Sequence, residues 1–166
     1  MLFFKKKKNE TTKEEIVTEM KAYVSGKVIS ITEVKDPVFS SKALGDGIGI
    51  EPENENIVAP CAGTISAVML DSKHAIGMTL NNGAEILIHV GIDTVGMHGE
   101  GFEQFVEEGD HVAQGDKLMT FNKALIQSKG LDATCIMAVA NADEYPGISF
   151  CTGMDAVQNE TVICKF

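Results

Sequence analysis

The chain is built from short apolar runs, rich in valine, isoleucine and threonine, that alternate with glycine, asparagine and aspartate. Examples are GTISAVML, AEILIHVGI and TVICKF. β-Branched residues favour strands, and turn signals that recur about every 8–12 residues are typical of a sandwich or barrel. Only residues 122–129 (NKALIQSK) have a helical pattern. The sequence predicts an all-β fold, an antiparallel β-sandwich or barrel of the barrel-sandwich hybrid type, with one or two short helices.

The beginning of the chain has a different texture. Residues 2–4 are apolar, residues 5–8 are four consecutive lysines, and the stretch up to residue 20 is polar. We therefore predict a flexible arm over residues 1–20 and a single domain over residues 21–166. Apolar residues followed by lysines would suit a weak contact of residues 1–8 with an anionic membrane surface. A solvated arm is the simpler interpretation.

Charge and cysteine usage exclude several classes of protein. The chain has 14 lysines, no arginine and 24 acidic residues, a net charge of −10. This composition argues against nucleic acid as a partner and favours a basic protein partner. Cys61, Cys135, Cys151 and Cys164 form no C-x-x-C motif, and the first residues lack the long apolar stretch and cleavage site expected of a signal peptide. We expect a cytoplasmic protein with reduced thiols.

His89 stands out because it lies inside an apolar strand, AEILIHVGI. With the two-residue period of a strand, Ile86, Ile88 and Val90 share one face, while His89 shares the other with a leucine and a glycine. A buried imidazole is costly unless its polar atoms find partners. The residues by themselves leave two interpretations of His89 open, a core histidine with satisfied polar atoms and a functional imidazole beside the core.

A second histidine is brought near the first by a predicted hairpin. Asn81-Asn82-Gly83 has the composition of a tight turn, since asparagine and glycine accept positive φ. Counting outward from this turn places residues 74–76 opposite residues 88–90. Cross-strand neighbours lie about 5 Å apart, so we expect His74 and His89 to meet.

A pair of histidines is compatible with three chemistries. The pair could bind zinc with a third ligand such as Asp93, or act as a general acid and base. Alternatively, one imidazole could be a nucleophile toward phosphorus while the other supports it through a hydrogen bond. The residues by themselves leave these three open.

Two further segments are similar to each other and to a known carrier element. Residues 58–65 (VAPCAGTI) and 106–118 (VEEGDHVAQGDKL) resemble the hammerhead elements of biotinyl and lipoyl carriers. Such carriers also need an exposed lysine at a hairpin tip, and no lysine here has that setting. We therefore do not expect a swinging-arm carrier.

Between about Val24 and Ile163, the chain resembles the enzyme IIA domain of the glucose family of the bacterial sugar phosphotransferase system. The resemblance is carried by PVFS at residues 37–40, GDGI at 45–48, VAP at 58–60, His74 and, above all, IHVGIDTV at 88–95. It implies an antiparallel β-sandwich with a shallow apolar depression that holds two histidines. It also implies that the phosphocarrier protein HPr donates a phosphoryl group, which then passes to a cysteine on the IIB domain of a sugar permease.

The resemblance assigns roles to individual residues. It implies that His89 is the phosphoryl acceptor, that His74 is its companion, and that Ser72, where the family usually has threonine, bonds His74. It points to the Gly91 carbonyl as the acceptor for the other ring nitrogen of His89. Partner contacts would come from two acidic residues and an apolar rim, with leucines in place of several family aromatics. These are Asp36, Asp93, Val38, Phe39, Leu44, Leu70, Leu87 and Val95. We expect no metal and no cofactor.

Two alternative functions are kept open. Lysostaphin-like zinc hydrolases have a related fold, and His89-x-x-x-Asp93 has their His-x-x-x-Asp spacing, but the chain lacks their His-x-His pair. The other alternative is a cytosolic regulatory binding module, a role that could coexist with phosphoryl transfer.

Overall fold

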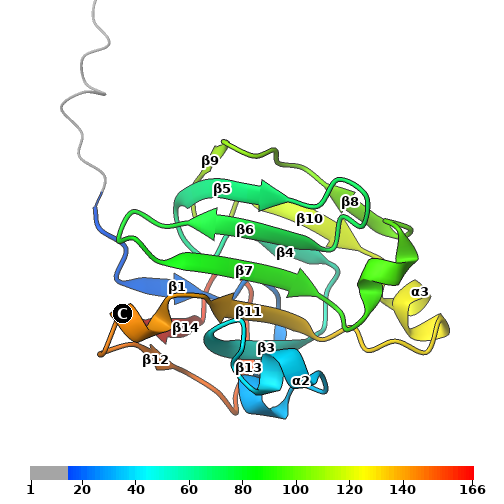
Figure 1. Cartoon of the computed structure of the whole chain (residues 1–166), viewed down its shortest axis with the longest axis horizontal. Helices are drawn as coiled ribbons and strands as arrows, with labels where there is room; N and C mark the ends of the chain where they lie inside the picture. Colours follow the sequence, from blue (N-terminus) through cyan, green and yellow to red (C-terminus); the bar gives the residue numbers. More distant parts are fainter. Residues whose placement is uncertain (1–14) are drawn as a thin grey trace, which may run out of the picture.

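A computed structural model describes residues 15–166, which form three antiparallel sheets joined by tight turns (Figure 1). The largest has eight strands in the order β13-β2-β3-β11-β7-β6-β5-β9. Its strands in chain order are β2 (Gly26–Ser30), β3 (Asp46–Pro52), β5 (Gly63–Val68), β6 (Ala75–Thr79), β7 (Glu85–Val90), β9 (His111–Val112), β11 (Cys135–Val139) and β13 (Asp155–Ala156). The predicted antiparallel β fold is confirmed.

Two smaller sheets complete the strand layers, in the orders β4-β10-β8 and β1-β14-β12. Their strands are β1 (Glu19–Lys21), β4 (Asn56–Val58), β8 (Phe102–Gln104), β10 (Lys117–Phe121), β12 (Ser149–Phe150) and β14 (Val162–Lys165). The two carrier-like segments meet here, because Val58 pairs with Lys117 and the Ala59 amide donates to the Asp116 carbonyl at 2.8 Å.

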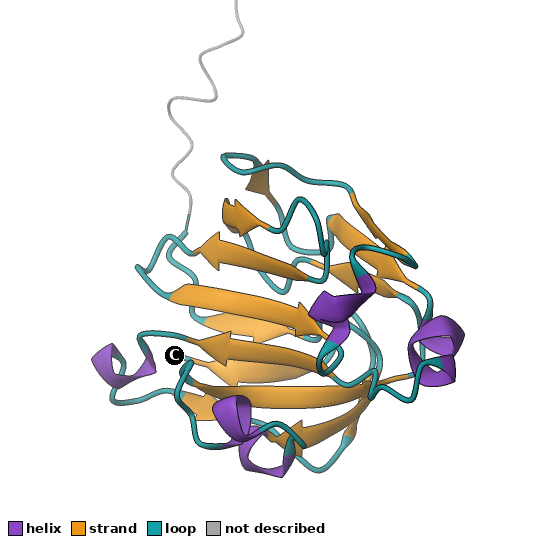
Figure 2. Cartoon of the chain, turned by 45° about the vertical axis from the view of Figure 1, so that its right-hand side comes forward, coloured by secondary structure: helices purple, strands orange, loops and turns teal. Residues whose placement is uncertain are grey.

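The helical segments are short and lie on the outside of the strand layers (Figure 2). They are α2 (Pro37–Ser40), α3 (Lys123–Ser128) and three 3₁₀ turns, η1 (Ile31–Glu33), η2 (Thr94–Met97) and η3 (Ala142–Glu144). The predicted helix near residues 122–129 is present as α3, which Asn122 caps by accepting from the Leu125 amide. The sequence interpretation did not include α2, although Asp36 caps it and proline occupies its first turn, both ordinary helix-start signals.

The core has a large and a small part. The large part fills the space between the sheets and includes Ile86, Ile88 and Val90 of β7. The small part lies on the opposite face of β7 and β11, where Phe39 of α2 packs with Ile136 and Ile92. β7 therefore has an alternating pattern, with one face in the main core and the other toward α2.

The body of the protein begins earlier than the predicted boundary at residue 21. Met20 is fully buried, Glu19 pairs with Lys165 of β14, and the Val17 amide donates to Asn81 Oδ1 at 2.8 Å. The last part of the predicted arm is thus part of the folded domain. The burial of Met20 and the pairing of β1 with β14 hold this stretch in place although most of its residues are polar. Residues 1–14 of that arm, including the lysine run, lie outside the described residues.

Candidate functional site

The site is built on the hairpin formed by β6 and β7, which lie side by side in Figure 1. The turn has the predicted form: the Leu80 amide donates to the Ala84 carbonyl at 2.9 Å, and Gly83 adopts φ +92°. The register places Ala75 directly opposite His89. The predicted pairing of residues 74–76 with 88–90 is therefore confirmed, and His74 lies at the start of β6 beside the end of β7.

The two imidazole rings are in contact. The His74 and His89 ring centroids are 4.5 Å apart, and their planes are inclined at 88°. Phe39 of α2 contacts His89 as well, with ring centroids 4.9 Å apart and an interplanar angle of 61°. The His89 ring is thus held between a second imidazole and an aromatic ring, which fixes its orientation.

His74 is positioned by a hydroxyl group. Its Nδ1 lies 2.7 Å from Ser72 Oγ, and both residues are nearly excluded from solvent. The hydrogen bond expected between these two residues is present. If Ser72 donates to Nδ1, the proton of the neutral His74 ring lies on Nε2.

Burial keeps both rings neutral near pH 7. Desolvation and, to a smaller extent, the neighbouring His74 lower the pKa of His89 to about 4, although the Gly91 backbone and Asp36 act in the opposite direction. Desolvation also lowers the pKa of His74. A neutral imidazole has a free electron pair on one nitrogen and can act as a nucleophile.

The Gly91 carbonyl is close to His89 but does not complete the expected hydrogen bond. His89 Nδ1 is buried and has no partner of hydrogen-bonding geometry. The Gly91 backbone is nevertheless near enough to favour the protonated ring, since it acts to raise the pKa of His89.

The turn after β7 is tightly constrained. Gly91 has φ +82°, and a Cβ at this position would lie 2.4 Å from Thr94 Cγ2. Thr94, for which no role was predicted, is fully buried and donates from Oγ1 to the Val90 carbonyl at 2.6 Å. Nothing in a single sequence distinguishes such a threonine from an exposed one in a polar turn.

The predicted apolar rim is exposed in four positions and covered in two. Val38, Leu44, Leu70 and Val95 are all large exposed apolar residues, and Leu70 is 81% exposed. Leu87 is partly buried against the small core. Phe39, expected on the rim, is only 3% exposed, because its ring packs on His89 and the core below α2. Its role in this structure is to support the histidine.

The two acidic residues predicted to contact partners lie at the starts of α2 and η2. Asp36 caps α2 by accepting from the Val38 amide at 2.9 Å, and it lies near enough to His89 to raise the pKa of the ring. Asp93 begins η2 with φ +61° and makes no side-chain capping bond. Its carboxylate is therefore not used in capping the turn.

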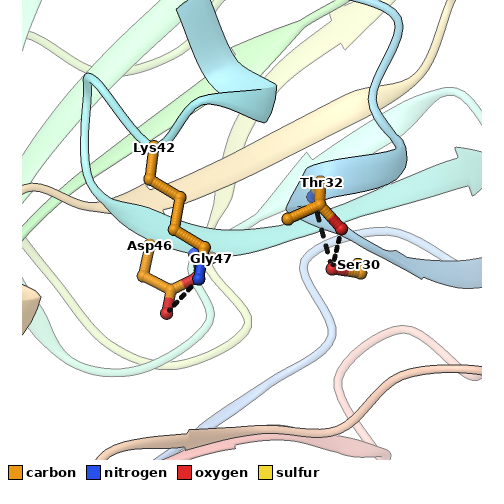
Figure 3. Close-up of polar contacts among 5 residues, drawn as sticks. All are labelled: Ser30, Thr32, Lys42, Asp46 and Gly47. Atoms are coloured by element: carbon orange, nitrogen blue, oxygen red, sulfur yellow. Dashed lines mark hydrogen bonds and ion pairs between the residues drawn. The ribbon is translucent and has the colours of Figure 1, made fainter.

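Short polar contacts lie at the start of η1 and in the loop that follows α2 (Figure 3). Lys42 lies just after α2, and its Nζ is 3.5 Å from Oδ2 of Asp46 in β3. Oδ1 of Asp46 accepts a hydrogen bond from the Gly47 amide. Ser30 Oγ accepts from the Thr32 amide at the start of η1. The exposed ion pair contributes little to stability, so these contacts mainly set local geometry.

The hydrolase alternative lacks a third metal ligand. Among residues 15–166, no group of three or more histidine, cysteine, aspartate or glutamate side chains is arranged to hold a metal ion. His98 instead contacts Asp71, and His111 contacts Thr64, both on the surface. The four cysteines are free thiols. None of the helices described here has the length and apolar character of a membrane span.

Comparison with known proteins identifies the family of this chain. Residues 18–145 match the family described as phosphoenolpyruvate-dependent sugar phosphotransferase system, EIIA 1. The chain belongs to this EIIA family. It is a phosphotransferase component, a phosphoryl carrier that acts in sugar uptake.

Individual relatives agree with this assignment. The chain is 41% identical over 157 residues to the glucose-specific EIIA component of Bacillus anthracis, covering 95% of this chain and 92% of the relative. It is 43% identical over 122 residues to the beta-glucoside-specific EIIBCA component of Bacillus subtilis strain 168, covering 74% of this chain and 20% of that longer protein. The solved structure of glucose permease IIA from Mycoplasma capricolum superimposes with a TM-score of 0.76 at 31% identity, covering 91% of this chain and 96% of that one.

Proposed function

We propose that His89 is the residue that carries the phosphoryl group, that the phosphorylated form of HPr donates it, and that a cysteine of a IIB domain receives it. The observation that carries this proposal is the edge-to-face pair of His74 and His89, in which His89 is only partly buried. A carrier must present its nucleophile at a surface that two successive partners can cover, and this arrangement suits such a surface.

The acceptor atom follows from the burial of the His89 ring. Nδ1 is buried, whereas the residue as a whole is only partly buried. With the proton on Nδ1, the electron pair on Nε2 attacks phosphorus. The new N–P bond forms as the bond between phosphorus and the donor atom breaks, so no proton has to leave in this step.

The role of His74 is to stabilise charge on the transferring group. Phosphoryl transfer has a loose transition state with charge spread over the equatorial oxygens, and catalysis is mostly positioning and electrostatic stabilisation. The Ser72 hydroxyl, donating to Nδ1 of His74, leaves the Nε2 proton of His74 free to bond a phosphoryl oxygen. The chain has no arginine, so a guanidinium group at this step would have to come from the partner.

The proposed partners fit the surface. The exposed residues Val38, Leu44, Leu70 and Val95 offer an apolar contact area, and Asp36 and Asp93 add negative charge beside it. An apolar centre with a charged rim is the usual anatomy of a protein interface. The relative named EIIBCA carries its EIIA stretch in a longer chain, which supports a IIB domain as the recipient.

The two steps of the proposal are tested separately by glutamine variants. His89→Gln should accept no phosphoryl group from phosphoenolpyruvate, enzyme I and HPr, as followed by intact mass. His74→Gln should still accept it but should be slowed in donation to a IIB domain, by about 10²–10³ if one preorganised donor is lost. Equal behaviour of two folded variants would contradict this division of roles.

A further inference from the structure

Thr94 is a buried polar residue that lies five positions after the proposed acceptor. Its side chain is fully excluded from solvent, and Oγ1 donates to the Val90 carbonyl at 2.6 Å. A hydroxyl group in this position is strongly held, because leaving the carbonyl unsatisfied in a buried site is unfavourable. The bond closes the turn between the end of β7 and η2.

The same turn is held from its other side by the segment before β11. The Gly91 amide donates to the Thr134 carbonyl and the Ile92 amide to the Asp132 carbonyl, both at 2.9 Å. The turn contains two residues with positive φ, Gly91 at +82° and Asp93 at +61°. Such a conformation persists where surrounding contacts determine it, and Thr94 supplies the contact from within.

These bonds fix the peptide groups that follow His89. The Val90 amide donates to the His74 carbonyl at 2.8 Å, and the Val90 carbonyl accepts from Thr94. Val90 is therefore tied on one side to the companion histidine and on the other to Thr94. Among the backbone–backbone hydrogen bonds of residues 15–166 outside the regular elements, none ends on the Gly91 carbonyl. The nearby His89 Nδ1 is buried and unpaired.

Thr94 also packs against the backbone that it bonds. A Cβ on Gly91 would come within 2.4 Å of Thr94 Cγ2, so the methyl group lies close to the Gly91 backbone. Ile92, in the same turn, packs in the small core with Phe39, whose ring contacts His89. The turn thus supports both the Nδ1 side and one face of the His89 ring.

We propose that Thr94 is a positioning residue for phosphoryl transfer, which holds the turn so that the Gly91 carbonyl stays within reach of His89 Nδ1. Pairing of Nδ1–H with this carbonyl selects the tautomer that has its electron pair on Nε2. This inference rests on the proposed role of His89. Thr94 does not touch the transferring group, so its effect passes through the orientation of the imidazole.

The test compares variants of the full chain that differ by the Thr94 hydroxyl. Thr94→Val replaces the hydroxyl with a methyl group of similar size. Thr94→Ser and Thr94→Ala both lose the original methyl and differ from each other only in the hydroxyl. This second pair keeps the test informative if the valine variant does not fold. Thr161→Val is a matched control, since it removes a hydroxyl bonded to the Val157 amide in the C-terminal loop.

Two readouts are needed. The ¹⁵N chemical shifts of the His89 ring report the tautomer in the unphosphorylated protein, and rapid-quench assays with phospho-HPr report the rate of phosphoryl acceptance. We expect the threonine and serine forms to hold the proton on Nδ1. The valine and alanine variants should show a mixture of tautomers and accept the phosphoryl group about 10- to 100-fold more slowly, the scale of a small misplacement. The Thr161→Val variant should match the wild type in both readouts.

Folded valine and alanine variants with the wild-type tautomer and rate would overturn the proposal. So would a serine variant that behaves like alanine, because the hydroxyl would then have no role. A failure of the proposed function would be recognised differently: the wild-type chain would accept no phosphoryl group on His89, while the ring shifts would still report whether Thr94 controls the tautomer.

Discussion

Ser72 Oγ lies 2.7 Å from Nδ1 of His74, and both side chains are almost wholly buried. If the hydroxyl is the donor, Nδ1 of the neutral ring accepts this bond. The ring proton then lies on Nε2, which does not contact Ser72. His74 can then donate to an oxygen of a group carried by His89, whose ring centroid is 4.5 Å away. The hydrogen bond from Ser72 thereby sets the tautomer of His74 and makes its Nε2 a hydrogen-bond donor.

Replacing Ser72 should therefore affect transfer more than folding. Ser72→Ala is expected to lose about 1 kcal/mol of unfolding free energy, the net value of a typical hydrogen bond. Donation to a IIB domain should slow by roughly 10-fold, less than the loss of a direct donor. Ser72→Thr keeps the hydroxyl and should retain the wild-type rate. A threonine variant as slow as alanine would show that the hydroxyl is not the relevant group.

The stability of the protein should fall as the pH is lowered from about 6.5 to 4. A histidine in the unfolded chain takes up its proton near pH 6.5, whereas burial lowers the pKa of His89 to about 4. The unfolded state then binds more protons across this window, so acid favours unfolding. A shift of this size corresponds to about 3 kcal/mol.

The comparison that isolates this effect is with His89→Gln, which lacks the titrating group. Urea unfolding at pH 7 and pH 4 should show a larger loss of unfolding free energy for the wild type than for the variant. Equal losses would mean that the His89 ring is not held neutral by the fold. His74, whose pKa is also lowered by burial, should contribute in the same direction in both proteins.

Glycine is required at position 91 for two reasons that can be separated. Gly91 and Gly109 both have positive φ, +82° and +95°, but only Gly91 has an atom in the way of a Cβ, Thr94 Cγ2 at 2.4 Å. Gly109→Ala should lower the free energy of unfolding by the cost of backbone strain alone, about 1–3 kcal/mol. Gly91→Ala should be destabilised further and should accept the phosphoryl group more slowly. Thermal unfolding and phosphoryl acceptance measure the two effects, and equal costs for the pair would contradict the steric argument.

The start of the folded body can be located by two truncations. Removing residues 1–14 should leave phosphoryl acceptance and thermal stability close to those of the full chain, because this stretch is mostly polar and lacks apolar periodicity. Removing residues 1–20 deletes the buried Met20 and two pairings of β1 with β14. Loss of one buried methionine side chain costs about 2–5 kcal/mol. Equal stability of the two truncated proteins would show that residues 15–20 do not stabilise the domain, as the predicted boundary at residue 21 implies.

Local patterns in the sequence were sufficient to predict the core of the site. The alternation of Ile86, Ile88 and Val90 with His89 placed the imidazole on the other face of its strand, and the asparagine-glycine turn placed His74 across from it. Both arguments depend only on strand period and turn chemistry, which act over a few residues. The structure agrees with both, since Ala75 pairs with His89 and the three apolar residues lie in the main core.

What could not be predicted depends on contacts between distant segments. Phe39 was expected on the rim and is covered, because α2 folds back over β11 and brings the ring onto His89. Met20 follows a polar stretch but is enclosed by strands from the far end of the chain. Thr94 lies in a turn that the distant Asp132–Thr134 segment bonds through the Gly91 and Ile92 amides. No window of sequence contains both partners of such a contact.

Phosphopeptide mapping tests the central claim most directly. Glu85 is the one glutamate between His74 and His89, so cleavage after glutamate at neutral to alkaline pH separates the two histidines into different peptides, and fragmentation distinguishes His89 from His98. After incubation of the full chain with phosphoenolpyruvate, enzyme I and HPr, we predict a single acid-labile phosphoryl group on His89, in the peptide that begins at Ile86. A phosphoryl group on His74, in the peptide that ends at Glu85, or none on either histidine, would contradict the account.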